Sequence, residues 1–480
     1  MPSNPAPRRQ SPRALTRLLC VAALFAAVWA LLEAAVSLWF AGRASYGLHL
    51  TLVTIGFEIA SGTLALWLAR GNRAPPVSAA APAAAPAPLS VLVAAYDEEA
   101  GIVATVRSIL AQQGVAIEVV IADDGSSDDT VPLLCRAFDL RPSTSGIHRS
   151  REGKREGQQE SQIVVLSLPH RGKGATLNAA AAVARHPLLV TVDADTLLAP
   201  LALARLAAAF NDPTVAAATG SVLVARTPSL LTRFQQIEYV RNTLIRVAWA
   251  GLSALEQLPG AFMAVRADWL TAAGGYPTQS LTEDYELVYR IYRCAAQTGR
   301  PLQISVVPTA CAYTDAPGDL RSLMRQRTRW FAGFLTTLFR FRQLIGNPKA
   351  GVFGVVKLPI KVLDAIHPPL SLLSLLILIA DANDLVLRPL ALALFALRWF
   401  WDSLTLALAV RFARRQGAEI DLGRAGSVWP WVYVLADGVS YFWLRQLAVL
   451  RAYAWAVRPP KQWKPLRSAQ ASPPAADLAA

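Results

Sequence analysis

Hydrophobic residues are distributed along this chain of 480 residues in two different ways. In the middle of the chain, short apolar runs alternate with segments whose apolar positions recur every three to four residues, which is typical of strands followed by helices. Toward both ends the apolar runs are longer, and residues 17–40 form a nearly continuous apolar run broken by Glu33. A run of that length can cross about 30 Å of hydrocarbon. The pattern predicts an α/β domain inserted between transmembrane helices.

The first two apolar runs are predicted to form a transmembrane hairpin. Residues 17–40 exceed the apolar core of a signal peptide, which is about 7 to 15 residues long, and a second run covers residues 49–69. The arginine-rich start of the chain is placed in the cytoplasm by the positive-inside rule, so two crossings return the chain to the cytoplasm. Residues 72–88 are rich in proline and alanine, as in a semi-rigid linker.

Three further crossings are predicted in the last third of the chain, at residues 368–380, 385–410 and 428–450. Charged residues just before the first of these runs favour an interfacial position for its opening half. Three crossings that start inside would leave the basic C-terminal tail outside, against the charge rule, so one segment is expected to be re-entrant or interfacial. The predicted units are the hairpin (1–71), the linker (72–88), the cytosolic domain (89–320), an interfacial helix region (321–350), the C-terminal membrane helices (351–455) and a disordered basic tail (456–480).

Four short apolar runs in the cytosolic domain are predicted to be strands, at residues 89–95, 117–122, 163–168 and 187–192. Each is followed by a helical pattern, which indicates a mostly parallel sheet flanked by helices, with ligands at the carboxyl ends of the strands. The polar residues 141–162 are predicted to be a mobile insertion.

Acidic residues follow two of these strands. Asp123 and Asp124 end the second strand, and Asp193 and Asp195 end the fourth. Because residues two apart in extended backbone point the same way, Asp193 and Asp195 can both face one hard cation or one ribose. The alternatives are a capped strand-to-helix turn for the first pair and solvated turn acids for the second.

A third acidic pair and a polar helical face stand later in the chain. Glu283 and Asp284 precede an apolar helical run, where acids also serve as a helix cap. Gln326, Arg329 and Trp330 share one face of a predicted helix and suit a sugar diphosphate, because arginine pairs with phosphate and tryptophan offers a flat surface to a sugar ring. An amphipathic helix lying on the membrane fits the same residues.

Composition narrows the possible functions. The chain is 54% hydrophobic with a net charge of +14, and its basic residues are mainly scattered arginines beside the apolar runs. This distribution favours contact with membrane lipids over nucleic-acid binding. The four cysteines have no C-x-x-C spacing, so neither a zinc site nor a disulfide framework is indicated.

The order of these elements resembles the processive, membrane-embedded family 2 glycosyltransferases, which include cellulose, hyaluronan, chitin and poly-N-acetylglucosamine synthases. The matching motifs are "AAYDEE", "ADDGSSDDT", "HRGKGATLN", "DAD", "GGYPTQSLTEDYEL" and "QRTRW", within about residues 88–345. Asp97 departs from the family, which commonly has asparagine there.

The resemblance implies a GT-A-type fold and a role for each matching residue. Tyr96 and Asp123 would hold the uracil and ribose of a UDP-sugar, and Lys173 would contact the nucleotide. Asp193 and Asp195 would bind the nucleotide and Mg²⁺ or Mn²⁺. Asp284 would be the catalytic base, with Glu283 beside it. The three residues of the "QRTRW" motif that share a helix face, Gln326, Arg329 and Trp330, would lie near the diphosphate and acceptor.

The expected function is inverting transfer of a hexose or N-acetylhexosamine from a UDP-sugar to a growing polysaccharide, coupled to export across the inner (plasma) membrane. Such an enzyme would be a multi-pass protein with its catalytic domain in the cytoplasm, in contact with membrane lipids and without a nucleic-acid partner. The alternative is a non-processive transferase that glycosylates a membrane lipid. A non-catalytic transporter would explain the spans and leave the ordered acids unexplained.

Overall fold

A computed structural model describes most of the chain. The described residues are 46–71, 86–141, 146–150, 162–380, 387–415 and 429–458. The predicted first transmembrane helix (17–40), most of the Pro/Ala-rich linker and the basic tail lie outside the described residues. All statements below concern the described part.

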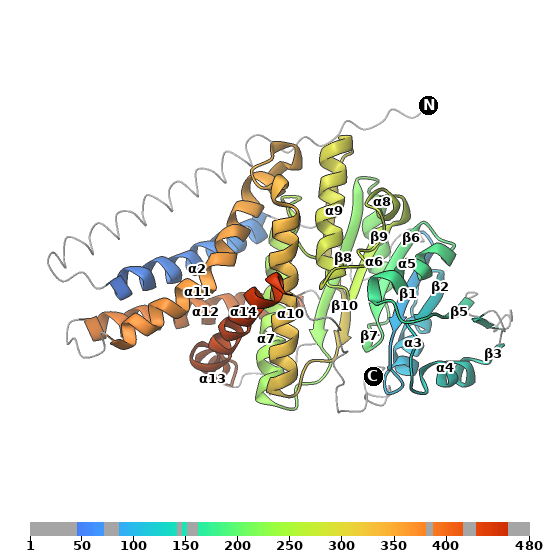
Figure 1. The fold of residues 1–480 in the computed structure, drawn as a ribbon, viewed down its shortest axis with the longest axis horizontal. Coiled ribbons are helices and arrows are strands. Elements are labelled where there is room, and N and C mark those ends of the chain that lie inside the picture. The colour runs from blue at the N-terminus through green and yellow to red at the C-terminus, as the bar shows by residue number, and fades with distance from the viewer. Residues whose placement is uncertain are drawn as a thin grey trace.

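A ten-stranded sheet forms the body of the protein, in the order β3-β4-β5-β2-β1-β6-β9-β8-β10-β7 (Figure 1). Its strands are β1 (Leu89–Ala95), β2 (Ile117–Asp123), β3 (Leu140–Arg141), β4 (Ile147–Ser150), β5 (Gln162–Ser167), β6 (Leu188–Asp193), β7 (Thr196–Leu198), β8 (Val215–Val224), β9 (Phe262–Arg266) and β10 (Gln303–Thr314).

The centre of the sheet is parallel, and the edges are mixed. Strands β5, β2, β1 and β6 run side by side in parallel, and they are the four predicted from sequence. Beyond them β9 pairs antiparallel with both β6 and β8, whereas β8 and β10 are parallel. The predicted α/β class with a mostly parallel sheet is confirmed. The prediction that residues 141–162 form a mobile insertion is wrong for part of this stretch. Residues Ile147–Ser150 form β4, which pairs antiparallel with β5.

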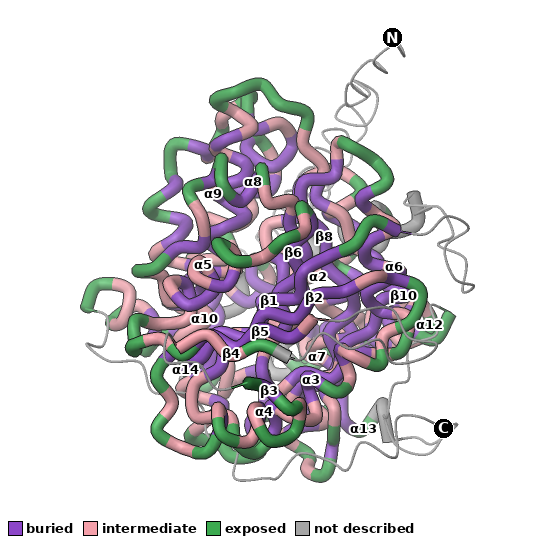
Figure 2. Tube along the Cα trace, turned by 90° about the vertical axis from the view of Figure 1, so that its right-hand side faces the viewer, coloured by how far each residue is buried: buried purple, intermediate pink, exposed green. Residues whose placement is uncertain are grey.

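Helices cover both faces of the sheet, and its strands are almost entirely buried (Figure 2). The helices of this domain are α3 (Ile102–Leu110), α4 (Thr130–Phe138), α5 (Lys173–Val183), α6 (Ala202–Ala208), α7 (Leu230–Ala250), α8 (Ala267–Ala272), α9 (Glu283–Thr298) and α10 (Leu320–Arg340). Burial on two faces explains why the central strands read as continuous apolar runs rather than as alternating patterns.

A second group of helices projects away from the sheet (Figure 1). These are α2 (Tyr46–Gly71), α11 (Leu358–Ala380), α12 (Leu387–Arg415), α13 (Trp429–Ala436) and α14 (Phe442–Val457). Helix α11 is preceded by a π-helical turn, Phe353–Lys357, and another, Asp437–Tyr441, joins α13 to α14. Two helical stretches within the described residues are long and apolar enough to cross a membrane, Phe353–Ile377 and Leu392–Arg415.

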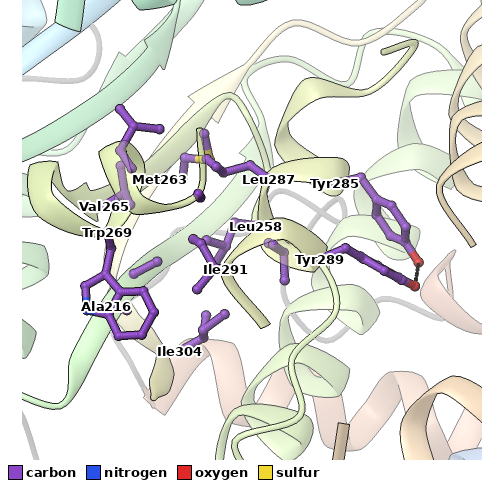
Figure 3. Close-up of a cluster of buried hydrophobic side chains, with 14 of the residues drawn as sticks. Ala216, Leu258, Met263, Val265, Trp269, Tyr285, Leu287, Tyr289, Ile291 and Ile304 are labelled. Carbon is purple, nitrogen blue, oxygen red and sulfur yellow. Dashed lines mark hydrogen bonds between the residues drawn. The ribbon is translucent and has the colours of Figure 1, made fainter. Parts of the chain in front are cut away.

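Helix α9 is fixed by a buried apolar cluster (Figure 3). Leu287 and Ile291, one helical turn apart, pack among side chains of β9 and α8 such as Met263 and Trp269. On another side of α9, the hydroxyls of Tyr285 and Tyr289 are 3.0 Å apart. This packing holds the N-terminal end of α9, which carries Glu283 and Asp284, in one place relative to the sheet.

Candidate active site

The carboxyl ends of the central strands bring distant acids to one edge of the sheet. Asp193 is the last residue of β6, and its neighbour across the ladder is Ala94, near the end of β1. Tyr96 follows β1 directly. Two residues beyond Asp193, Asp195 leads into β7 at the far edge of the sheet, and its Oδ1 accepts a hydrogen bond from the Thr314 hydroxyl at 3.1 Å.

A cavity of about 600 Å³ opens beside these strand ends. It is lined by nine of the ten residues for which the sequence predicts a role, namely Tyr96, Lys173, Asp193, Asp195, Glu283, Asp284, Gln326, Arg329 and Trp330. The tenth, Asp123, is buried, and its carboxylate accepts hydrogen bonds from the backbone N–H of Ser126, at 3.1 Å, and from the Ser126 hydroxyl. Asp124, its neighbour, lines the cavity instead.

Asp124 organises the loop that precedes α5. Its carboxylate accepts hydrogen bonds from the backbone N–H groups of Arg171 (2.8 Å) and Gly172 (2.9 Å) and from the Thr176 hydroxyl (2.8 Å). The loop thereby presents Lys173, the first residue of α5, to the cavity. The doubled acid in "ADDGSS" is the only sequence signal for this second role.

Lys173 lies between two carboxylates. Its Nζ is 2.6 Å from Oδ1 of Asp193 and 3.0 Å from Oε1 of Glu283. Burial disfavours the charged form of Lys173, but these two carboxylates outweigh it and raise the pKa of the amine. Burial would likewise raise the pKa of Glu283, but Lys173 and Arg329 lower it below its usual range. Lys173 and Glu283 are therefore both charged near neutral pH.

Acidic groups crowd the strand-end side of the cavity. Burial, with the neighbouring charges of Asp193 and Asp315, raises the pKa of Asp195 to about 7. Burial, with the charges of Asp195 and Asp193, raises the pKa of Glu98 to about 8. Glu98 is a cavity residue that sequence reasoning did not single out, although it belongs to the "AAYDEE" motif.

This side of the cavity fits a divalent cation that arrives with a substrate phosphate. Within the described residues, no group of three or more His, Cys, Asp or Glu side chains is arranged to hold a metal ion alone. Magnesium is commonly held by one or two carboxylates together with substrate phosphates and water. Asp193 and Asp195 supply two such carboxylates, and a bound cation would relieve the repulsion that raises the pKa of Asp195.

Asp284 is held by backbone donors at the start of α9. Its Oδ2 accepts a hydrogen bond from the N–H of Gly260 at 2.8 Å, and its Oδ1 accepts one from the N–H of Tyr285 at 2.8 Å. Burial and the neighbouring charge of Glu283 raise its pKa to about 6. Glu283 and Asp284 do lie in the first turn of a helix, yet both carboxylates also line the cavity. Capping therefore does not account for the pair.

Helix α10 forms another wall of the cavity. Gln326, Arg329 and Trp330 all line the cavity, and Nη1 of Arg329 donates a hydrogen bond to the carbonyl of Leu281 at 3.0 Å. One turn beyond Trp330, Gly333 lies against Thr282, the residue before Glu283, so closely that a Cβ there would overlap the threonine side chain. The close approach places the polar face of α10 beside the acidic start of α9.

The cavity continues past Asp284 toward the apolar helices. Its lining there includes residues that sequence reasoning did not assign. They are Tyr239, Asn242 and Arg246 of α7, Glu256 in the loop after α7, Lys361 and Asp364 of α11, and Phe442, Arg445 and Gln446 of α14. No local motif marks these positions. They come together only because α7 packs against α2 and α12, and α10 against α14.

A protein-family model matches the part of the chain that carries the acids of this cavity. Residues 86–333 match the family model described as "Glycosyltransferase like family 2", which is slightly more than half of the chain. The chain is 24% identical over 321 residues to the poly-β-1,6-N-acetyl-D-glucosamine synthase of Staphylococcus epidermidis, covering 66% of this chain and 71% of that protein. It is 25% identical over 255 residues to the Staphylococcus aureus synthase of the same name, covering 52% of this chain and 56% of that protein.

A solved structure shares the fold. A mannosyltransferase from Pyrobaculum calidifontis, in complex with GDP-Man and Mn²⁺, superposes with a TM-score of 0.51 over 85% of this chain and 99% of its own, at 20% sequence identity. At that identity the likeness concerns the fold alone.

Proposed function

Because this chain belongs to glycosyltransferase family 2, we propose that it transfers a hexose or N-acetylhexosamine from a UDP-sugar to a growing polysaccharide, with inversion of the anomeric configuration. One observation carries the proposal. A single cavity is lined by Asp193 and Asp195 at the sheet edge, by Asp284 of α9 and Trp330 of α10, and by residues of α11 and α14. These groups suit a donor site, a catalytic base and an acceptor site within one cavity.

The donor would bind at the sheet edge. The ring of Tyr96, which is 4.6 Å from the ring of His170, offers a flat surface for uracil. Asp193 and Asp195 would hold Mg²⁺ or Mn²⁺, and Lys173 and Arg329 are the nearby cations for the diphosphate. When bound, the divalent ion neutralises charge that develops on the leaving diphosphate.

Asp284 would take the proton of the attacking hydroxyl. Its two backbone hydrogen bonds fix the carboxylate, and a pKa of about 6 leaves it mostly ionised at neutral pH while keeping it a better base than an exposed aspartate. In-line attack on the anomeric carbon breaks the bond to the diphosphate oxygen, so the configuration inverts. Glu283 would act indirectly, through its ion pair with Lys173 and its charge beside Asp284.

The acceptor would lie between α10 and the apolar helices. Trp330 and Phe331 line this stretch and offer apolar surfaces to sugar rings. A hydrophilic polymer cannot cross hydrocarbon unaided, so extension beside membrane helices would allow coupled export. We infer that the protein is a multi-pass protein of the inner (plasma) membrane, with its catalytic domain in the cytoplasm and its α11 and α12 helices in contact with lipid.

A lipid acceptor is the second candidate. The far end of the cavity is lined in part by apolar residues of the membrane-side helices, Pro368, Phe442 and Val449. A lipid headgroup entering between these helices would reach Asp284 from the same side as a polysaccharide end. The donor site and the base would be unchanged in that case.

Product size separates the two candidates. Membranes containing the protein would be incubated with Mg²⁺ and a panel of radiolabelled UDP-sugars, starting with UDP-N-acetylglucosamine because the Staphylococcus relatives are named for that sugar. A high-mass polymer supports polysaccharide synthesis, whereas an organic-extractable product supports a lipid acceptor. Failure to transfer from any UDP-sugar would contradict both.

A further inference from the structure

One face of α7 lines the acceptor side of the cavity. Glu238, Tyr239, Asn242 and Arg246 are spaced so that they share a side of the helix, and all four are cavity residues. Asp284 lines the same cavity, and its charge acts on Arg246.

Most cations in this region have carboxylate partners. Arg327 is 2.8 Å and Arg445 is 3.8 Å from Glu238, and Lys361 is 2.8 Å from Asp364. Arg246 differs. Among the described residues, no hydrogen bond or ion pair engages its guanidinium. Burial lowers the pKa of Arg246, although the charges of four neighbours act in the opposite direction: Glu256, Tyr239, Asp284 and Glu238.

The two carboxylates whose charges act most strongly on Arg246, those of Glu256 and Asp284, are already engaged. Glu256 forms an ion pair with Lys357 at 3.0 Å, and Asp284 accepts hydrogen bonds from two backbone N–H groups. A guanidinium has five N–H donors and no acceptor, so a bound partner must supply oxygen atoms. A planar acyl group, with lone pairs in the plane of the guanidinium fork, is the best match. A sugar hydroxyl is a weaker one.

We propose that Arg246 is a specificity-determining residue for the acceptor, and that it binds an acyl oxygen on the acceptor sugar, either the carbonyl of an acetamido group or the carboxylate of a hexuronate. The inference rests on the proposed transferase function and names the acceptor class that this function leaves open. It predicts that a plain hexose acceptor, which has only hydroxyls, is used less well than an acylated one of the same length.

Arg246→Lys tests the proposal, because lysine keeps the charge and loses the planar pair of donors. Purified protein would be given one UDP-sugar and three acceptors of equal length, ending in a hexose, an N-acetylhexosamine or a hexuronate. The variant is expected to raise KM for whichever acylated acceptors the wild type uses by about tenfold to a hundredfold. KM for the UDP-sugar and for the hexose acceptor should change by less than about threefold.

Arg233→Lys is the matched control. Arg233 is on the same helix and contacts Tyr433, but it does not line the cavity. It should leave all acceptor KM values unchanged. If Arg246→Lys changes KM equally for acylated and hexose acceptors, or does not change it, the proposal for Arg246 is overturned. The proposed function is still upheld in that case, provided that the wild type transfers sugar. Absence of transfer by the wild type with every donor would instead overturn the proposed function itself.

Discussion

Lys173 and Glu283, the first residues of α5 and α9, form an ion pair with Nζ and Oε1 3.0 Å apart. They are 110 positions apart in sequence, and both line the cavity as the first residues of their helices. Lys173 also holds Asp193, so one side chain connects the strand-end acids to the acids of α9. The proposed donor site and the proposed base are therefore coupled electrostatically.

This coupling predicts a shift in the pH dependence of Glu283→Gln. The wild-type pKa of Asp284 is about 6, raised first by burial and then by the charge of Glu283. Because only ionised Asp284 can accept a proton, kcat/KM should fall as the pH drops below about 6. Removing the negative charge of Glu283 lowers the pKa of Asp284, so the acid limb of the pH profile should move to lower pH.

The measurement is kcat/KM against pH for both proteins at saturating divalent cation. Asp268→Asn is a suitable control, because Asp268 pairs with Arg300 on the exposed surface. An acid limb that stays in place or moves to higher pH in Glu283→Gln would contradict the coupling.

Divalent cations should be required for transfer, with Asp195 contributing to their binding. Chelation should abolish transfer, and Mg²⁺ or Mn²⁺ should restore it. In Asp195→Asn the cation concentration for half-maximal activity should rise by at least about tenfold, since a carboxylate ligand is lost. A titration of activity with each cation measures this. Full activity of wild-type protein in excess chelator would refute a role for the cation.

The contact between α10 and the start of α9 should limit substitution at Gly333. In Gly333→Ala the new Cβ would lie 2.6 Å from Cγ2 of Thr282, so α10 must move away from α9. Overpacking of this kind lowers the free energy of unfolding by about 1 to 3 kcal/mol. We expect reduced thermal stability in detergent and a lower kcat. Gly318→Ala is the control, because nothing lies within 4 Å of a Cβ at that position.

Local sequence patterns predicted those strands, helices and turns whose formation depends on residues close together in the chain. The alternation of short apolar runs and helical segments located the four parallel strands, and turn acids marked the strand ends at Asp193 and Asp195. The antiparallel strand β9 was missed, since "FMAVR" precedes a helix with no turn between them and takes its place between β6 and β8 only through long-range pairing.

The residues of the site also fall into two groups, those that a local motif marks and those that only long-range packing brings to the cavity. Residues in motifs, such as Asp284 and Trp330, were singled out, whereas Arg246 and Glu256 were not, because nothing in their local sequence distinguishes them from surface charges. Arg246 on α7 and Glu256 in the loop after it line the cavity because α7 packs against the membrane-side helices α2 and α12. Asp123 shows the converse. Its motif predicts ribose binding, while its carboxylate is occupied by Ser126 in this structure, and its role stays a prediction.

The most direct measurement is transfer by Asp284→Asn. Asparagine keeps the size of the side chain and can accept one of its two backbone hydrogen bonds, but its amide nitrogen cannot accept the other, and the side chain cannot take the acceptor proton as a base. With UDP binding and thermal stability measured on the same preparation, we predict unchanged binding and a loss of about a hundredfold to ten-thousandfold in kcat. Transfer at a near wild-type rate by folded Asp284→Asn protein would contradict the role of Asp284 as the catalytic base.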